Sequence, residues 1–210
     1  MNQQGFREGL LWVGIAVLLF AIVSVLLFWP ASESEQRKAH QQLPLAAAPT
    51  GGDFVLSRQG ESFSLDEYRG KVVLLYFGYT FCPDVCPTSL ALMRQALRQL
   101  DAAQLAQVQG LFISVDPERD TPQHLAEYTA FFHPQIRGIS GSEAQLREAA
   151  VLYGAAWRRV ESDSAMGYAV DHSSNTYVLD QRGVLVEILP HGSSAQAILD
   201  VVIPLLQAQP

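Results

Sequence analysis

The sequence predicts an α/β domain in which a central mixed β-sheet is flanked by helices, and three observations support this prediction. Residues 71–77 form an almost unbroken apolar run between Gly70 and Gly78, which is typical of a strand buried on both faces of a sheet. Apolar residues then recur at helical spacing over residues 87–100. A second apolar run at residues 111–115 follows, so that strand, helix and strand form a βαβ unit.

The remaining elements are predicted from the signals at their ends. Ser142 and Gln145 form a capping box for a helix that Gly154 stops. The other elements expected are a hairpin at residues 54–57 and 61–64, a helical turn at 65–69, a helix with Pro122 in its first turn, an antiparallel hairpin at 176–179 and 184–189, and a closing helix whose end Pro204 limits.

Both cysteines of the chain lie in the segment CPDVCP, directly after the central strand. Cys82 and Cys86 each precede a proline, which disfavours helical angles and places Cys86 at or just before the start of the following helix. The positive end of the helix dipole favours a thiolate there. The spacing lets both sulfurs share a metal ion or form a disulfide. A purely structural disulfide would close a very small loop and would constrain the unfolded chain little.

The element order, with a dithiol after the first central strand, is a thioredoxin-like plan, although the spacing is CxxxC and not CxxC. On this plan the loop before the strand at 176–179 faces the dithiol. That loop holds His172, which is therefore the remaining candidate metal ligand. Its neighbour Asp171 either orients a ligand through a hydrogen bond or is a solvated loop acid.

Composition and charge limit the class of protein. The chain has 49% hydrophobic and 17% charged residues and a net charge of −7. These values indicate a globular protein and argue against a nucleic-acid surface. The expected organisation is a short cytoplasmic leader at residues 1–9, a transmembrane anchor at 10–29, a flexible linker at 30–52 and a folded domain at 53–207.

The anchor prediction depends on an apolar run without charge. Residues 10–29 are long enough to span a bilayer as a helix, and Trp12 and Trp29 lie near its ends, where interfacial anchors are expected. The alternative is a cleaved signal peptide, but the apolar run is long for one and the following residues make a poor cleavage site. We expect a single-pass protein of the bacterial inner membrane with its C-terminal domain in the periplasm, because the leader has no room for a transit peptide.

Three motifs in order, GYTFCPDVCPTSL at residues 78–90, SVDPERDTP at 114–122 and VDHSSNTYVLD at 170–180, resemble the Sco/SenC family of membrane-anchored copper proteins. The resemblance implies copper, as Cu(I) or Cu(II), bound by Cys82, Cys86 and His172. It also implies delivery of this copper to the binuclear copper A centre of cytochrome c oxidase. The partners it implies are the copper-bearing subunit of that oxidase and another periplasmic copper carrier. Some family members carry His at the position of Phe81, which is not one of the expected ligands.

Two function classes remain open. In a copper chaperone the cysteines are ligands, whereas in a thiol–disulfide oxidoreductase they exchange electrons and keep the cysteines of the target reduced. Zinc is disfavoured because a structural zinc site normally closes with a fourth protein ligand. The other histidines are expected to have surface or capping roles: His40, His124, His133 and His191. The loop residues Asp116, Arg119 and Asp120 are expected to contact a partner or to cap the next helix. The polar segment 161–168 is expected to be a loop that is mobile without metal.

Overall fold

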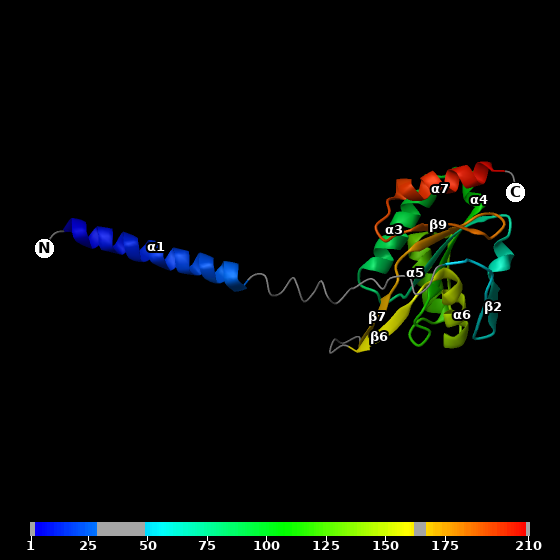
Figure 1. Cartoon of the computed structure of the whole chain (residues 1–210), viewed down its shortest axis with the longest axis horizontal. Coiled ribbons are helices and arrows are strands. Elements are labelled where there is room, and N and C mark those ends of the chain that lie inside the picture. Colours follow the sequence, from blue (N-terminus) through cyan, green and yellow to red (C-terminus); the bar gives the residue numbers. More distant parts are fainter. Residues whose placement is uncertain (1–2, 29–48, 162–166, 209–210) are drawn as a thin grey trace. The chain divides into compact units, whose positions relative to one another are not determined.

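The computed structural model describes residues 3–28, 49–161 and 167–208, and the chain divides into an N-terminal unit and a larger C-terminal unit. The N-terminal unit contains helix α1 (Gln3–Phe28; Figure 1). Within the part of the chain that the structure describes, no helix meets the length and hydropathy required to cross a bilayer. The anchor at residues 10–29 thus stays a prediction, and most of the expected linker at 30–52 lies outside the described residues.

A five-stranded mixed sheet forms the centre of the C-terminal unit, in the order β5-β4-β3-β8-β9. Strands β3, β4 and β5 are parallel, β8 runs antiparallel to β3, and β9 antiparallel to β8. Their bounds are β3 Val72–Gly78, β4 Val108–Ser114, β5 Ile136–Ile139, β8 Thr176–Leu179 and β9 Leu185–Leu189. Every residue of β3 and β4 is buried, as the apolar runs predict. The predicted mixed sheet is confirmed.

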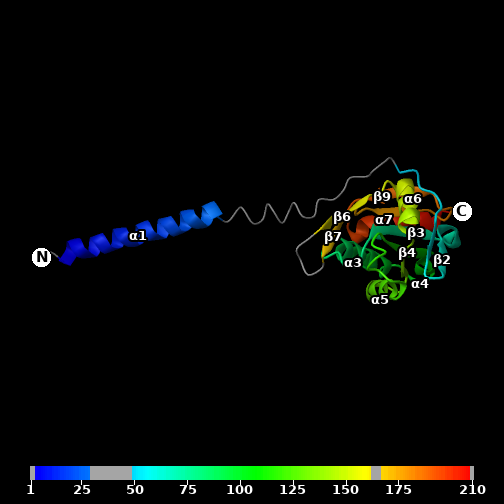
Figure 2. The same cartoon turned by 90° about the horizontal axis from the view of Figure 1, so that it is seen from below.

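Helices cover both faces of this sheet (Figures 1 and 2). On one face Tyr76 of β3 stacks on Phe112 of β4, which contacts Tyr128 of α5. On the other face Phe77 contacts Tyr153 of α6. The helix bounds are α3 Val85–Leu97, α4 Ala102–Ala106, α5 Pro122–Phe132, α6 Glu143–Tyr153 and α7 Ala195–Gln207. Consecutive residues of β3 thus point to opposite helical layers, which anchors the strand in the middle of the core.

Most of the residues that the sequence predicts at the ends of helices and strands have the expected role, and Pro204 is an exception. Strands β1 (Val55–Arg58) and β2 (Glu61–Ser64) form the hairpin, and the 3-10 turn η1 (Leu65–Tyr68) follows it. The capping box at the start of α6 is present, and Gly154 ends that helix with a φ of 62°. The prediction for Pro204 is wrong, because α7 continues past it to Gln207. Pro204 lies in the last turns, where its carbonyl still accepts from the amide of Ala208.

A separate two-stranded sheet was not expected. Strands β6 (Trp157–Glu161) and β7 (Tyr168–His172) pair antiparallel with each other and with no strand of the central sheet. His172 therefore ends a strand and does not lie in a loop. Along β7 burial alternates, with Tyr168, Val170 and His172 buried, but five residues are too few for this period to stand out in the sequence. The mobility expected for the segment 161–168 is untested, since residues 162–166 lie outside the described residues.

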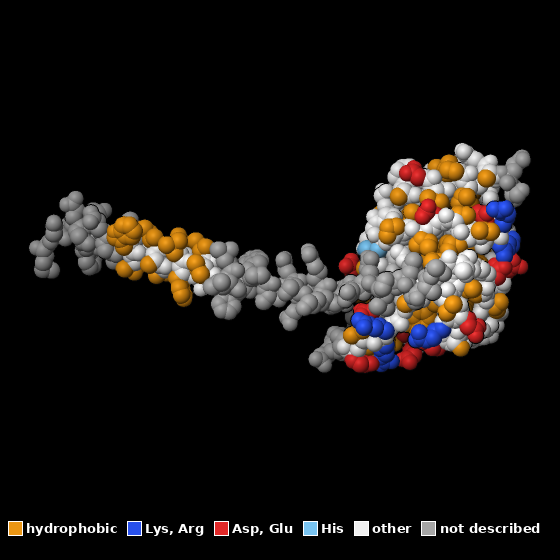
Figure 3. All heavy atoms as spheres, viewed as in Figure 1, with side chains coloured by type: hydrophobic (Ala, Val, Ile, Leu, Met, Phe, Trp, Pro, Cys, Tyr) orange, Lys and Arg blue, Asp and Glu red, His pale blue; other side chains and the backbone are white. Residues whose placement is uncertain are grey.

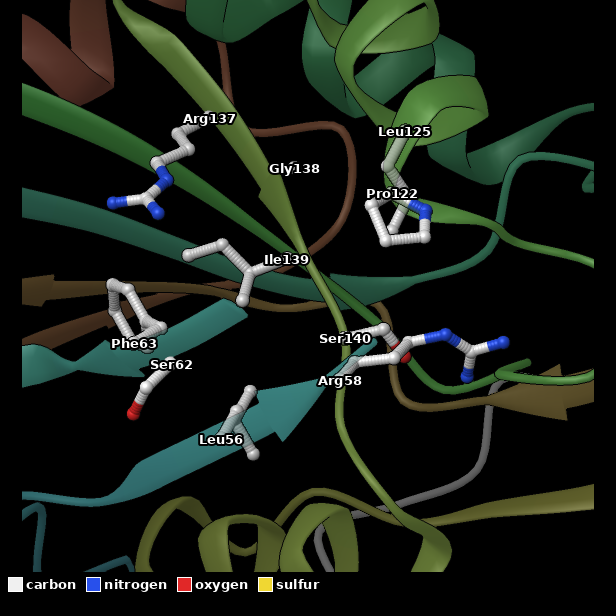
Figure 4. Close-up of a pocket in the computed structure, with 10 residues that line it drawn as sticks. All are labelled: Leu56, Arg58, Ser62, Phe63, Pro122, Leu125, Arg137, Gly138, Ile139 and Ser140. Carbon is white, nitrogen blue, oxygen red and sulfur yellow. The ribbon is translucent and has the colours of Figure 1, made fainter. Parts of the chain in front are cut away.

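A small cavity lies between the first hairpin and strand β5, and Figure 4 shows the side chains around it. Its volume of about 20 Å³ is enough for one water molecule. None of the three predicted metal ligands lines it. The cavity is a packing feature of the hairpin, separate from the cysteine segment.

The end of β3 demands a residue without a side chain. A Cβ atom at Gly78 would lie 2.7 Å from Cys86 Sγ, 2.8 Å from a ring carbon of Tyr76 and 2.9 Å from a ring carbon of Phe112. We predict that Gly78→Ala lowers the free energy of unfolding by about 1–3 kcal/mol, because the added methyl overpacks a buried site. Urea denaturation of the full chain measures this. Gly14→Ala, which adds the same methyl in open space, is the control, and an unchanged midpoint for Gly78→Ala would contradict the prediction.

Candidate metal centre

The two cysteines lie where β3 gives way to α3. Cys82 lies in the turn between the two elements, and its amide donates to the carbonyl of Tyr79 at 3.3 Å. Cys86 is the second residue of α3, one residue further into the helix than the sequence predicts. Its neighbour Pro87 is compatible with this position, because the amides of a first helical turn need no carbonyl partner within the helix. The first bond of the helix runs from Thr88 N to the carbonyl of Asp84 at 3.1 Å.

The structure brings all three predicted ligands together. Cys86 Sγ lies 3.3 Å from His172 Nε2. The ligand atoms of Cys82, Cys86 and His172 all lie within 4.8 Å of one another, and all three residues are buried. Ligand atoms held at about 2.0–2.3 Å from a single ion lie at most roughly 4.6 Å apart, so side-chain shifts of a few tenths of an ångström bring this cluster within the range of one ion. The geometry therefore fits one ion between two sulfurs and one nitrogen. No fourth Cys, His, Asp or Glu joins this group in the described part of the chain.

The imidazole is oriented for this role by its own backbone. Nδ1 of His172 lies 3.0 Å from the carbonyl oxygen of Ser173. A carbonyl can only accept, so Nδ1 donates to it, and Nε2 is the ring nitrogen that faces the sulfurs. The rings of Tyr76 and Tyr79 pack edge-on against the imidazole at centroid distances of 6.2 and 5.7 Å. The orienting group is thus a main-chain carbonyl, a type of partner that sequence alone does not reveal.

Asp171 does not orient the histidine. Its carboxylate accepts from Arg158 at 2.9 and 3.0 Å on the outer side of the β6–β7 hairpin. The register pairs Arg158 with Asp171 directly across the two strands, which explains the contact. Asp171 is thus neither a positioning group for His172 nor a purely solvated acid.

The two thiols are free and electrostatically unequal. The thiol of Cys86 donates to Cys82, and this hydrogen bond is the main cause that lowers the pKa of Cys82 to about 4. Burial raises the pKa of Cys86 well above its usual range, and its hydrogen bond to Cys82 acts in the same direction. In the metal-free protein the pair therefore holds one thiolate, on Cys82, and one thiol, on Cys86.

The acidic loop after β4 has a structural role that the sequence did not indicate. Asp120 is fully buried, and its carboxylate accepts from the amide of Thr80 at 3.0 Å, from the Thr80 hydroxyl at 2.5 Å and from Ser114 at 2.5 Å. It does not cap the next helix, since Thr121 does so by accepting from the amide of His124. Asp120 therefore fixes the segment that leads into Cys82.

The other histidines that the structure describes do not contribute to the cluster. Nε2 of His124 lies 2.9 Å from the Thr80 hydroxyl, His133 is the C-terminal cap of α5, and Nδ1 of His191 lies 3.1 Å from the Ser89 hydroxyl. Burial lowers the pKa of His133. These are the structural roles expected for them, and His40 lies outside the described residues.

Comparison with known proteins now identifies the family. The model of the SCO1/SenC family matches residues 43–207. The chain belongs to the SCO1/SenC family. Among the relatives of this family, the chain is 38% identical over 180 residues to "Protein SCO2 homolog, mitochondrial" of Bos taurus, covering 83% of this chain and 68% of that one. It is also 38% identical over 152 residues to a SCO2-like protein of Rickettsia felis, covering 71% of this chain and 74% of that one.

Solved Sco structures share the fold. ScoI of Arabidopsis thaliana, crystallised with copper bound, matches with a TM-score of 0.69 at 32% identity, over 75% of this chain and 98% of that one. Apo Sco1 of Thermus thermophilus matches with a TM-score of 0.65 at 37% identity, over 80% of this chain and 97% of that one. The predicted α/β architecture, with a central mixed sheet and flanking helices, is that of the Sco proteins.

The difference between the pKa values of Cys82 and Cys86 predicts which thiol is alkylated first. Because the pKa of Cys82 is about 4, its thiolate persists at pH 6 and is lost only as the pH falls towards 4. We predict that iodoacetamide at pH 6 labels Cys82 before Cys86 in the metal-free chain, as measured by peptide mass spectrometry. Cys86→Ala removes the donor, so labelling of Cys82 at pH 6 should slow by about ten-fold or more. Equal labelling of both cysteines would contradict the prediction.

Proposed function

We propose that this chain binds one copper ion through Cys82, Cys86 and His172 and delivers it to the binuclear copper A centre of cytochrome c oxidase. The observation that carries the proposal is the convergence of two sulfurs and one imidazole nitrogen within 4.8 Å of one another. It is supported by the relatives, because ScoI of Arabidopsis thaliana and ScoI of Bradyrhizobium japonicum, both more than 30% identical to this chain, have solved structures with copper bound.

The donor set suits a copper carrier. Thiolates are soft ligands that select Cu(I), and an imidazole nitrogen also satisfies Cu(II), so the site can hold either oxidation state. Three ligands leave a coordination position through which a partner can take the ion by ligand exchange. The thiolate of Cys82 is ready to bind, whereas Cys86 must release its proton when the ion enters. Copper is therefore the cargo of this site, and its uptake releases a proton.

The proposed place of action is the bacterial inner membrane. Residues 10–29 would anchor the chain as a single-pass helix, with residues 1–9 in the cytoplasm, residues 30–52 as a tether and the domain at 53–207 in the periplasm. The described hydrophobic side chains of α1, among them Trp12, Leu18 and Phe20, are exposed, as lipid-facing residues would be. The proposed partners are the copper-bearing oxidase subunit and a periplasmic copper carrier that loads the site.

The second candidate is a thiol–disulfide oxidoreductase, favoured by two free, adjacent thiols of which one has a lowered pKa. In that reaction the Cys82 thiolate attacks a disulfide of the target and forms a mixed disulfide, which releases one target thiolate. Cys86 then displaces the second target thiolate and loses its proton. The Cys82–Cys86 pair ends as a disulfide, and the target gains two electrons. His172 has no part in these steps.

The three-ligand site predicts a selective loss of Cu(II). We expect His172→Ala to weaken Cu(II) binding by more than the roughly 10–100-fold that loss of an outer-sphere contact costs, since it removes a ligand. Cu(I), held by the two thiolates, should be affected less. Competition titrations with chelators for each oxidation state measure both constants, and His124→Ala is the control. If Cu(II) affinity is the same in His172→Ala and the control, the three-ligand site is wrong.

The same variant separates the two functions. A copper-loaded full chain is mixed with the copper-free subunit of the oxidase, once with the subunit's cysteines reduced and once with them as a disulfide. For a carrier, His172→Ala abolishes the transfer of Cu(II) to the reduced subunit, whereas Cys86→Ala abolishes the transfer of copper in both oxidation states. For a reductase, His172→Ala reduces the disulfide at the wild-type rate and only the cysteine variant fails. A wild-type chain that transfers no copper to the reduced subunit would exclude the carrier mechanism.

A further inference from the structure

His172 lies on the β6–β7 hairpin, which does not pair with the central sheet in the described part of the chain. Strand β7 pairs with β6 alone, whereas the cysteines follow β3 in the middle of the sheet. The hairpin is closed at its base by its own bonds, such as the one from Ser173 N to the carbonyl of Ala156 at 2.9 Å. The distance between His172 and the sulfurs therefore depends on side-chain contacts between the hairpin and the rest of the domain.

Three residues connect the hairpin to the loop that follows β4, and we name Asp116, Arg119 and Tyr168 the latch. The Tyr168 hydroxyl, at the start of β7, donates to Asp116 Oδ1 at 2.7 Å. Arg119 Nε donates to the other oxygen of Asp116 at 2.5 Å, and Arg119 Nη1 donates to the carbonyl of Tyr168 at 3.1 Å. The Asp116 side chain is 3% exposed and that of Arg119 16%, so water competes little with this ion pair.

The latch also contacts the cysteine segment. The guanidinium carbon of Arg119 lies 3.6 Å from the ring centre of Tyr168 and 4.8 Å from that of Phe81, the residue before Cys82. Guanidinium–aromatic contacts at these distances are attractive. Tyr79, from the same segment, accepts a hydrogen bond from the amide of Val170 in β7 at 3.2 Å. Arg119 thus lies between the strand that carries the histidine and the turn that carries the first cysteine.

The outer surface of the hairpin is charged as well, but differently. Figure 3 shows acidic and basic side chains gathered at the end of the domain where β6 and β7 lie. Arg159 pairs there with Glu118 and Glu161, and all three side chains are about half exposed or more. Exposed pairs of this kind contribute little to stability. They connect the same segments as the latch and therefore offer a matched comparison.

We infer that the latch residues Asp116, Arg119 and Tyr168 are positioning residues that hold the imidazole of His172 against the dithiol and thereby set the preference of the site for Cu(II) over Cu(I). The inference rests on the proposed copper site. With the latch intact, three ligands meet and Cu(II) is favoured by the nitrogen. With the latch broken, the hairpin separates from the cysteine segment, and the two thiolates retain Cu(I).

The test uses Tyr168→Phe, which removes one hydroxyl and keeps the ring, and Arg119→Ala, both in the full chain. For each variant we expect the Cu(II) dissociation constant to rise by about 10-fold, as for other contacts that orient a metal ligand. The Cu(I) constant should change by less than about three-fold, since both thiolates remain. Amide exchange across Tyr168–His172 in the metal-free chain should be faster in both variants, while exchange in β3 and β4 stays at the wild-type rate.

Two controls make the outcome specific. The first control is Tyr68→Phe, which removes a phenolic hydroxyl that accepts from Nη1 of Arg137 at 3.1 Å. Tyr68 precedes the first residue of β3 and so lies at the opposite end of that strand from the cysteines. The double variant Glu118→Gln/Glu161→Gln removes the exposed pairs of the same hairpin and keeps Arg159, whose guanidinium carbon lies 3.7 Å from the ring centre of Tyr168. Neither should change the ratio of the two copper constants.

Equal changes in both constants, or unchanged exchange across Tyr168–His172, would overturn the inference. If His172→Ala binds Cu(II) as tightly as the wild-type chain, the proposed function is refuted instead. The amide-exchange measurement would still test the latch in that case.

Discussion

The contact between Cys86 Sγ and His172 Nε2 at 3.3 Å is the constraint around which the domain is arranged. It joins the first turn of α3 to the last residue of β7, 86 residues apart in the chain. For the two groups to meet, β3 must end in a residue without a side chain, because any Cβ at Gly78 would occupy the space of the Cys86 sulfur. The burial of β3 on both faces also helps the two groups to meet, because it fixes the position of the strand that precedes the turn with Cys82.

The electrostatics of the site follow from this burial. Cys86 is completely buried and Cys82 nearly so, and a low-dielectric site cannot hold two thiolates without a cation. The pair therefore shares its charge unequally, with the thiolate on Cys82 stabilised by the Cys86 thiol. A bound cation would remove the reason for this inequality, because both sulfurs then face a positive charge. The same free dithiol is the starting state for metal binding and for disulfide exchange, which explains why the thiols alone do not discriminate between the two functions.

The parts of the fold that the sequence predicted correctly are those with local causes. The apolar runs of β3 and β4, the capping box of α6 and the proline at the start of α5 each act within a few residues. The three candidate metal ligands, which the structure brings together, were predicted because their segments meet in a thioredoxin-like plan and because the motifs around them resemble the Sco/SenC family. Apart from Pro204, which lies inside α7, the errors concern contacts between distant segments. Asp120 bonds to Thr80, 40 residues away, and not to the next helix, and the partner of the His172 ring is a carbonyl. No period or spacing encodes either.

The placement of the third ligand on a separate hairpin has a physical consequence. A ligand on β3 or β8 could be withdrawn only by breaking the hydrogen bonds of the central sheet, which the buried core does not permit. His172, by contrast, can move with β6 and β7 as one unit, because their mutual pairing is independent of the other sheet. The contacts that join the hairpin to the rest of the domain each involve a side chain. They include Tyr168 to Asp116, Arg119 to Tyr168, Val170 to Tyr79 and Arg159 to Glu118, together with the rings of Tyr76 and Tyr79 against His172. The proposed carrier would both hold and release an ion, and it would need one ligand whose release does not unfold the rest. The arrangement of rigid cysteines and a separately mounted histidine supplies it.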